Sequence, residues 1–155
     1  MPDLIQKQKT REKQEVKVYV GYEGVKTFYN EILEKLDKGD EYLAITFHDE
    51  SLDNSALEIF FSNFHTRRAK AKIKAKILVN DKDKLAMKNL DFTKTGLYEF
   101  KKTTQSLPAG HCIFGDTVAF FNWGSTPRVF VMICEENAIQ YRNFFYDMWK
   151  KAKII

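Results

Sequence analysis

The residues of this chain that could do chemistry by type and order are His111, Asp116 and the pair Gly124-Ser125. A histidine, an aspartate, a hydrophobic strand and a Gly-Ser pair follow one another in one half of the active site of some phosphodiesterases. There the histidine attacks phosphorus, a cation stabilises the charged oxygens of the five-coordinate phosphate, and a second histidine protonates the leaving group. A working site of this kind needs all of these parts.

The spacing around His111 departs from the pattern of phospholipase D type phosphodiesterases. That pattern has a lysine two residues after the histidine, an aspartate five residues beyond the lysine, and an asparagine after Gly-Ser. Here Ile113 occupies the lysine position, Asp116 follows His111 by five residues instead of seven, and Thr126-Pro127 follows Gly-Ser. We therefore predict that the chain is not an enzyme. The alternative is a phosphodiesterase or nuclease that assembles one composite site from two chains, with His111 facing its counterpart.

Other catalytic, metal and cofactor patterns are missing from the sequence. The three histidines His48, His65 and His111 are far apart, and none has a cysteine or histidine partner at zinc spacing. Neither His48 nor His65 begins a second copy of the His111 pattern. The 7 glycines form no phosphate-binding loop of the Walker or dinucleotide type. The sequence predicts no metal and no cofactor.

Length and composition indicate one globular domain. The chain has 155 residues, of which 44% are hydrophobic and 13 are phenylalanine, enough to build a core without metals or disulfides. Cys112 and Cys134 lie in hydrophobic runs and are expected to be buried free thiols. The first 15 residues lack the apolar stretch of a signal peptide, and no run approaches a membrane span. We expect a cytoplasmic protein that does not contact membranes.

The positive charge is concentrated in one stretch. The net charge is only +4, but eight lysines and arginines lie between Arg67 and Lys84. Lysines at every second position are typical of a solvated helix end and an exposed strand face. No aromatic residue alternates with them to stack on bases, which argues against direct nucleic-acid binding. Such binding remains an alternative, and its affinity would fall steeply with salt.

Hydrophobic periodicity predicts an α/β fold. In the first half, strands at 16–21, 40–47 and 75–80 alternate with a helix from Tyr22, closed by Gly39, and a helix that Ser55 caps. The strand at 40–47 is apolar throughout, as expected for a strand covered on both faces. In the second half, strands are expected at 97–102, 111–115, 117–123 and 128–134, with a tight turn at Gly115-Asp116 and a final helix from about Glu135. This order predicts a set of parallel strands followed by an antiparallel segment and a long packing helix. Helical spacing places one apolar face on that helix, made of Ala138, Tyr141, Phe145, Met148, Trp149 and Ala152.

Four phrases along the chain resemble one known family. They are VKVYVGYEGVKTFYNEIL, FFSNFHTRRAKAKIKAKILVND, IFGDTVAFFNW and AIQYRNFFYDMWKKA. Together they resemble the effector-sensing domain of TrmB-like archaeal transcription regulators, over about residues 15–153. The resemblance implies a single α/β domain with a phospholipase D-like mixed sheet flanked by helices, at residues 16–155. Residues 1–15 would be a polar tail or the stub of a linker helix.

The resemblance also implies a function. A TrmB-like sensor domain is catalytically inactive and binds a small-molecule effector, and the family resemblance implies a homodimer. The chain lacks the winged helix-turn-helix of the family, so DNA would be bound only through a separate or removed domain. The alternative is a dimerisation or protein-interaction module without a small ligand, using an apolar patch around Phe144, Met148 and Trp149.

Ligands of open α/β sheets usually bind where the strands end. A polar loop follows the second strand, and several polar or aromatic residues of the second half are expected near it. Trp123 could instead be a core residue and Asp116 a turn residue. The expected ligand-binding residues are His48, Asp49, Glu50, His111, Asp116, Trp123 and Ser125.

Overall fold

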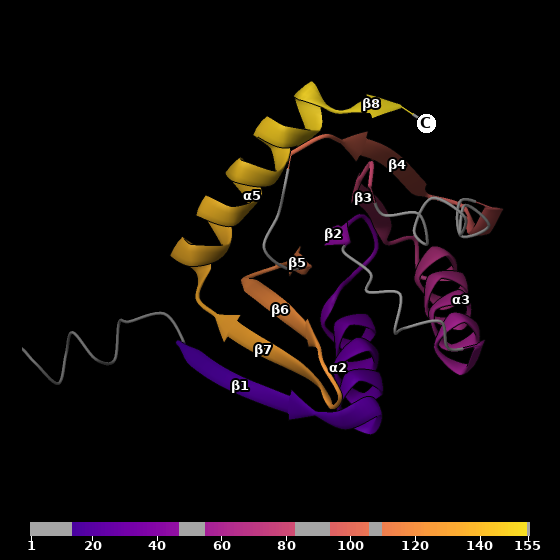
Figure 1. Ribbon diagram of the computed structural model, residues 1–155, viewed down its shortest axis with the longest axis vertical. Coiled ribbons are helices and arrows are strands. Elements are labelled where there is room, and N and C mark those ends of the chain that lie inside the picture. Colours follow the sequence, from indigo (N-terminus) through magenta and orange to yellow (C-terminus); the bar gives the residue numbers. More distant parts are fainter. Residues whose placement is uncertain (1–13, 47–54, 83–93, 106–109, 155) are drawn as a thin grey trace, which may run out of the picture.

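The computed structural model describes residues 14–46, 55–82, 94–105 and 110–154, and every statement about structure below concerns these residues. They form one eight-stranded sheet with the strand order β1-β7-β6-β5-β2-β3-β4-β8 (Figure 1). The elements in chain order are β1 (Glu15–Val20), α2 (Gly21–Lys35), β2 (Glu41–Thr46), α3 (Ser55–Lys70), β3 (Lys74–Asn80), β4 (Tyr98–Thr103), β5 (His111–Phe114), β6 (Thr117–Trp123), β7 (Pro127–Ile133), α5 (Glu135–Lys151) and β8 (Lys153–Ile154). The predicted α/β fold with a mixed sheet is confirmed.

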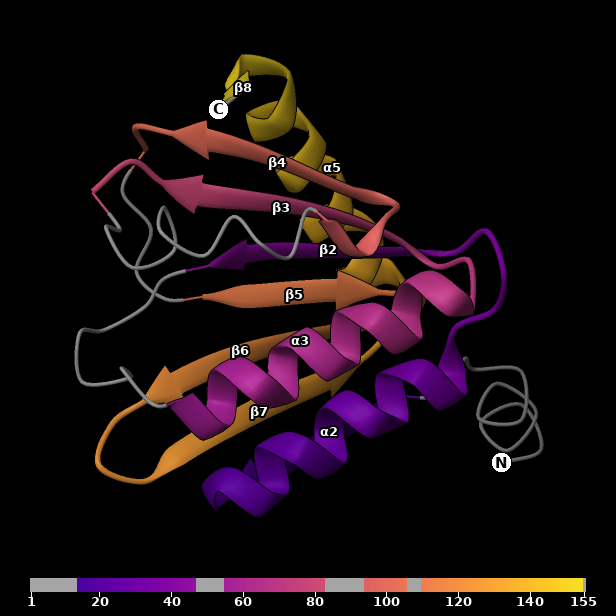
Figure 2. The ribbon, with the colours of Figure 1, turned by 90° about the vertical axis from the view of Figure 1, so that its right-hand side faces the viewer.

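The helices divide between the two faces of the sheet. Figure 2 shows α2 and α3 in front of the sheet and α5 behind it. The larger core lies under α2 and α3, where Phe28, Ile32 and Phe64 pack on the sheet. The smaller core lies under α5, where Phe145 and Met148 pack on the other face. Each face therefore has its own apolar layer, as the alternation of side chains along the strands requires.

The prediction was wrong about which strands run parallel to one another. β2, β3 and β4 are parallel neighbours, whereas β1 lies at the far edge and pairs antiparallel with β7. The sequence order strand-helix-strand had suggested that 16–21 belongs to the parallel set. Its alternation of valines with polar residues instead suits an edge strand with one exposed face, while the continuous apolar run of β2 suits the centre.

The first helix ends earlier than its closing glycine suggested. α2 ends at Lys35, and Leu36 caps it by donating its N–H to the carbonyl of Ile32. Gly39 lies in the turn beyond, with a φ of +93°, and donates its N–H to the carbonyl of Lys72. Gly39 therefore shapes the turn into β2, where the left-handed backbone favours glycine, rather than closing the helix.

The basic stretch is only partly a solvated surface, contrary to the prediction. Arg68 is 1% exposed, and its guanidinium donates to the carbonyls of Ile73, Leu97 and Gly96 at 2.5, 3.1 and 3.0 Å. It thereby joins the end of α3 to the segments that lead into β3 and β4. The acceptors are neutral backbone carbonyls, which do not balance the positive charge of Arg68. The role of these hydrogen bonds is therefore structural.

Lys76 is a second exception within the basic stretch. Its ammonium lies 3.4 Å from a carboxylate oxygen of Glu41 and 3.3 Å from the hydroxyl of Tyr146, which itself donates to Glu41. Burial alone would lower the pKa of Lys76, but these two partners raise it above its ordinary value. The three groups tie α5 to the first residue of β2 and the middle of β3.

The predicted hairpin and final helix are confirmed. Gly115 and Asp116 form the two-residue turn between β5 and β6. On α5, the predicted apolar face is buried at Ala138, Phe145 and Met148. Both cysteines are free, as predicted, although only Cys112 is fully buried and Cys134 is half-buried. Within the described ranges, no helix is long and apolar enough to cross a membrane.

Candidate functional site

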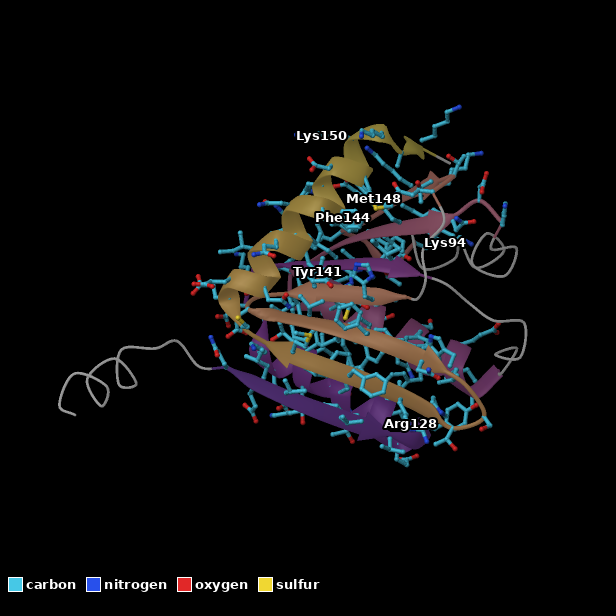
Figure 3. All side chains as sticks on the ribbon, turned by 60° about the vertical axis from the view of Figure 1, so that its left-hand side comes forward. Lys94, Arg128, Tyr141, Phe144, Met148 and Lys150 are labelled. Atoms are coloured by element: carbon cyan, nitrogen blue, oxygen red, sulfur yellow. The ribbon has the colours of Figure 1, made fainter. Side chains whose placement is uncertain are left out.

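His111 begins β5 on the side of the sheet where the parallel strands β2, β3 and β4 end. We call this row of strand ends the carboxyl edge, and the row at the other ends of these strands the opposite edge. It lies across from Ile45 on β2 and from Phe120 on β6. Its imidazole is buried between two aromatic rings, with centroid distances of 5.7 Å to Phe120 and 5.7 Å to Tyr141 of α5. The rings of Phe120 and Tyr141 are 5.5 Å apart. Figure 3 shows Tyr141 on the flank of α5 that faces the sheet.

Trp123 ends β6 near the same edge but projects from the other face of the sheet. It packs against the core under α2 and α3, stacked on Phe121 with centroids 5.7 Å apart and rings 8° from parallel. Side chains alternate along a strand, so position 123 shares its face with 121 and not with Phe120. Trp123 and His111 therefore do not line one surface. Ser125 is exposed in the turn that follows Trp123.

Asp116 lies at the opposite edge of the sheet, in the turn between β5 and β6. Its carboxylate accepts hydrogen bonds from the ammonium of Lys35 and, at 3.0 Å, from the hydroxyl of Thr117. Burial alone would raise the pKa of Asp116, but these hydrogen bonds and the charge of Lys35 lower it below its ordinary value. Asp116 thus fastens the turn to α2 and is separated from His111 by the length of β5.

The loop residues expected at the carboxyl edge, His48, Asp49 and Glu50, lie outside the described residues. Of the seven expected ligand-binding residues, four are described, and they do not form one site. Ser125 is exposed in the turn after Trp123, and the other three occupy three different surfaces. His111 lies on the face of α5, Trp123 on the face of α2 and α3, and Asp116 at the opposite edge.

Ile113 occupies the position at which the phosphodiesterase pattern has its lysine. Its side chain is 1% exposed and packs in the core under α5, with Leu43 and Val118 directly across on the neighbouring strands. A lysine there would place an ammonium in an apolar layer, at a large cost in desolvation. Position 113, where the phosphodiesterase pattern has the lysine that stabilises phosphate oxygens, is therefore part of the hydrophobic core in this chain. In the part of the chain that the structure describes, no group of histidine, cysteine, aspartate or glutamate side chains could hold a metal ion.

Neither aromatic neighbour of His111, Phe120 or Tyr141, is among the residues predicted for the site. The signal for Phe120 was present, because a two-residue turn at Gly115-Asp116 sets the register that places position 120 across from 111. Tyr141 could not be found in this way. It was correctly placed on the buried face of α5, but which strand that face meets depends on how the helix crosses the sheet.

Comparisons with known proteins identify the fold. No protein-family model and no curated protein sequence matches this chain. Among solved structures, Nuc from Salmonella typhimurium, a member of the phospholipase D family, superposes with a TM-score of 0.64 at 12% identity, covering 92% of this chain and 99% of Nuc. NucT from Helicobacter pylori gives a TM-score of 0.66 at 10% identity, covering 92% of this chain and 100% of NucT. The chain has a phospholipase D-like fold.

A third solved structure carries the same fold. TrmBL2, described as an archaeal chromatin protein with a novel mode of DNA binding, superposes with a TM-score of 0.61 at 18% identity. The match covers 99% of this chain and 59% of TrmBL2, so the chain spans little more than half of that protein. The expected likeness to a TrmB-like protein is thus confirmed at the level of the fold. Within the phospholipase D-like fold, this chain resembles both a phospholipase D family member and a DNA-binding chromatin protein.

Proposed function

We propose that this chain is a catalytically inactive, effector-sensing domain of a TrmB-like transcription regulator. It acts in the cytoplasm as a homodimer and influences DNA only through a separate DNA-binding domain. The observation that carries the proposal is Ile113, buried in the core at the position where phosphodiesterase chemistry needs a cation. The shared fold with TrmBL2 supports it.

The geometry around His111 suits binding better than catalysis. The sheet contributes His111 and Phe120, and α5 contributes Tyr141, so these three side chains come from two separately packed layers. Two aromatic rings beside an imidazole offer stacking surface together with one polar group, as in many sites for small molecules. An effector that contacts both layers would favour one position of α5 over another, because a ligand shifts a domain only through its difference in affinity between two states.

A thermal-shift screen tests effector binding. The purified chain is heated with sugars, sugar phosphates, nucleotides and amino acids, because a ligand of the folded state raises the melting temperature by mass action. We expect a saturable shift with one compound class that Tyr141→Ala abolishes. The matched control is Gln140→Ala, one residue away on α5 but exposed, which should keep the shift. A shift that both variants retain would place the effector elsewhere.

A phosphodiesterase assay tests the absence of catalysis. With bis(p-nitrophenyl) phosphate or single-stranded DNA as the substrate, we expect no hydrolysis above a protein-free blank. Hydrolysis that copurifies with the chain and disappears in His111→Asn would refute the proposal. That result would instead favour the composite site made from two chains, with His111 as the nucleophile.

The alternative function, an interaction module without a small ligand, is supported by a different surface from the one expected. Met148 and Trp149 are buried, and only Phe144 of that predicted patch is exposed. The larger group of exposed apolar side chains lies on β1 and β7. This surface borders the His111 site, since Phe130 lies directly across from Phe120, whose ring packs against Tyr141 of α5.

A further inference from the structure

The face of the sheet under α5 is only partly covered. α5 packs over β2, β3, β5 and the first part of β6. Farther along the same face, β1 and β7 carry five apolar side chains that are between 37% and 72% exposed, namely Val16, Val18, Val20, Phe130 and Met132. Figure 3 views this face, with α5 over its upper part and β1 and β7 below the helix.

The strand register makes these side chains one continuous surface. Val18 lies directly across from Phe130, and Val16 lies directly across from Met132. Residues directly opposite on antiparallel strands project to the same side. The exposed valines therefore extend the apolar layer of the α5 face to the edge of the sheet. Surfaces of this kind usually mark a site of association.

β1 is also an open edge, since among the described residues its one neighbour in the sheet is β7. Natural edge strands are usually protected from pairing by lysines, prolines or bulges. In β1 the exposed side carries valine at every position. Its charged residues, Glu15 and Lys17, project to the side of α2 and pair with each other at 3.6 Å. Lys17 therefore limits the registers in which another strand can pair with β1, whereas the valine side of the strand does not oppose pairing.

We propose that β1 pairs antiparallel with the β1 strand of a second copy of this chain, so that the two sheets join across a twofold axis. In a joined sheet, opposite residues must project to the same face, which restricts the register. Two such registers pair five residues of β1 with five of its counterpart. One is centred on Lys17 and the other on Val18.

Charge selects the register centred on Val18. Centring on Lys17 would place the two Lys17 side chains directly opposite each other, which is destabilising. Centring on Val18 places Val18 opposite Val18, Val16 opposite Val20, and Lys17 opposite Tyr19 of the second copy. The hydroxyl of Tyr19 donates to the carboxylate of Glu31, so each Lys17 would approach a carboxylate of the other chain. The interface is thus complementary to itself in both shape and charge.

Self-complementarity is the reason to assign the surface to a second copy rather than to another protein. The inference rests on the homodimer of the proposed function but not on effector binding. A failed effector screen would not contradict the proposed β1 interface, and a finding that the chain is a monomer would not contradict effector binding.

The mass of the chain in solution is the first test. Sedimentation equilibrium of the full chain should give twice its mass of 18.2 kDa. Val18→Lys should give the monomer mass, because the substitution places two ammonium groups opposite each other at the axis. Val18 is more than half exposed, so the variant should fold, which its circular dichroism and melting curve verify. Ile139→Lys, at an exposed apolar position on α5, is the matched control and should remain a dimer.

Cross-linking tests the register. Under mild oxidation, Val18→Cys should form a covalent dimer, because Cβ atoms of opposite residues lie about 4.5 to 5.5 Å apart. Val16→Cys should not, because its two copies would be four residues out of register, about 13 Å along the strand. The unsubstituted chain controls for Cys112 and Cys134. A monomer at every concentration, a dimer that survives Val18→Lys, or efficient cross-linking of Val16→Cys would each overturn the proposal.

Discussion

Replacing His65 should change how the stability of the domain depends on pH. His65 lies in α3, buried among aromatic rings, and its Nδ1 accepts a hydrogen bond of 3.2 Å from Nε of Arg68. Burial, and then the charge of Arg68, lowers the pKa of His65 to about 3. A protonated imidazole would also place a donor against the Arg68 donor. His65 is therefore neutral in the folded protein at pH 5 and above.

The size of the effect follows from proton linkage. The unfolded chain takes up a proton on His65 below pH 6.5, whereas the folded chain does so only near pH 3. The folded pKa is lowered, so this histidine reduces the free energy of unfolding as the pH falls from 6.5 towards 3. Each pH unit in that window costs about 1.4 kcal/mol, so the loss at pH 5 is about 2 kcal/mol. At pH 7.5 the effect is close to zero.

The assay is urea unfolding of the wild-type chain and His65→Gln at pH 7.5 and pH 5.0. Glutamine can still accept the Arg68 hydrogen bond but does not titrate. The difference in the free energy of unfolding between the two proteins at pH 7.5 serves as the baseline. Groups that titrate equally in both proteins cancel when this difference is compared with the one at pH 5.0. We expect the wild type to lose about 2 kcal/mol more than the variant between the two pH values, which moves its midpoint by about 1 M urea. Equal losses in the two proteins would refute a lowered pKa at His65.

Three further substitutions test the packing that positions the site. Arg68→Met removes the guanidinium and its hydrogen bond to the carbonyl of Ile73, while the carbonyl of Leu97 still accepts the N–H of Ala75, so the free energy of unfolding should fall by about 1 to 3 kcal/mol in urea titrations. Phe145→Ala empties the centre of the core under α5 and should cost about 3 to 5 kcal/mol by the same measurement, with loss of the helix signal at a lower temperature. Asp116→Asn should cost at most about 1 kcal/mol at pH 7, because its bond to Lys35 is partly exposed. Since the pKa of Asp116 is lowered, this carboxylate stabilises the fold at neutral pH and loses its effect in acid, so the variant should show a shallower decline of melting temperature with acidity.

Local patterns predicted the elements well. Alternation identified β6 and β7, helical spacing identified the buried face of α5, and the Gly115-Asp116 turn identified the hairpin. These signals are local because each depends on a few neighbouring residues. The continuous apolar run of β2 also correctly predicted a central strand. The fold class could therefore be predicted from the sequence.

Long-range pairing and the composition of the site could not be predicted in the same way. No residue pattern in β1 indicates that its neighbour in the sheet is β7, which lies more than a hundred residues farther along the chain. Arg68 reads as one more cation in a basic stretch, because its acceptors are backbone carbonyls that leave no sequence signal. His111 and Trp123 were expected in one site because β5 begins and β6 ends at the same edge, although the alternation along these strands already implied opposite faces.

α5 is held to the sheet at both of its ends. Before its first turn, Cys134 donates its N–H to the carbonyl of Asp116 at 2.9 Å, and after its last turn β8 pairs with β4. A helix restrained in this way resists swinging outward from one hinge, whereas a small rotation about its own axis leaves both attachments in place. Tyr141 lies on the flank near the carboxyl edge, and Tyr146, bonded to Glu41, lies on the flank near the opposite edge. Displacing Tyr141 would thus turn Tyr146 against the start of β2, and α5 would mechanically connect two edges of the sheet that share no direct contact.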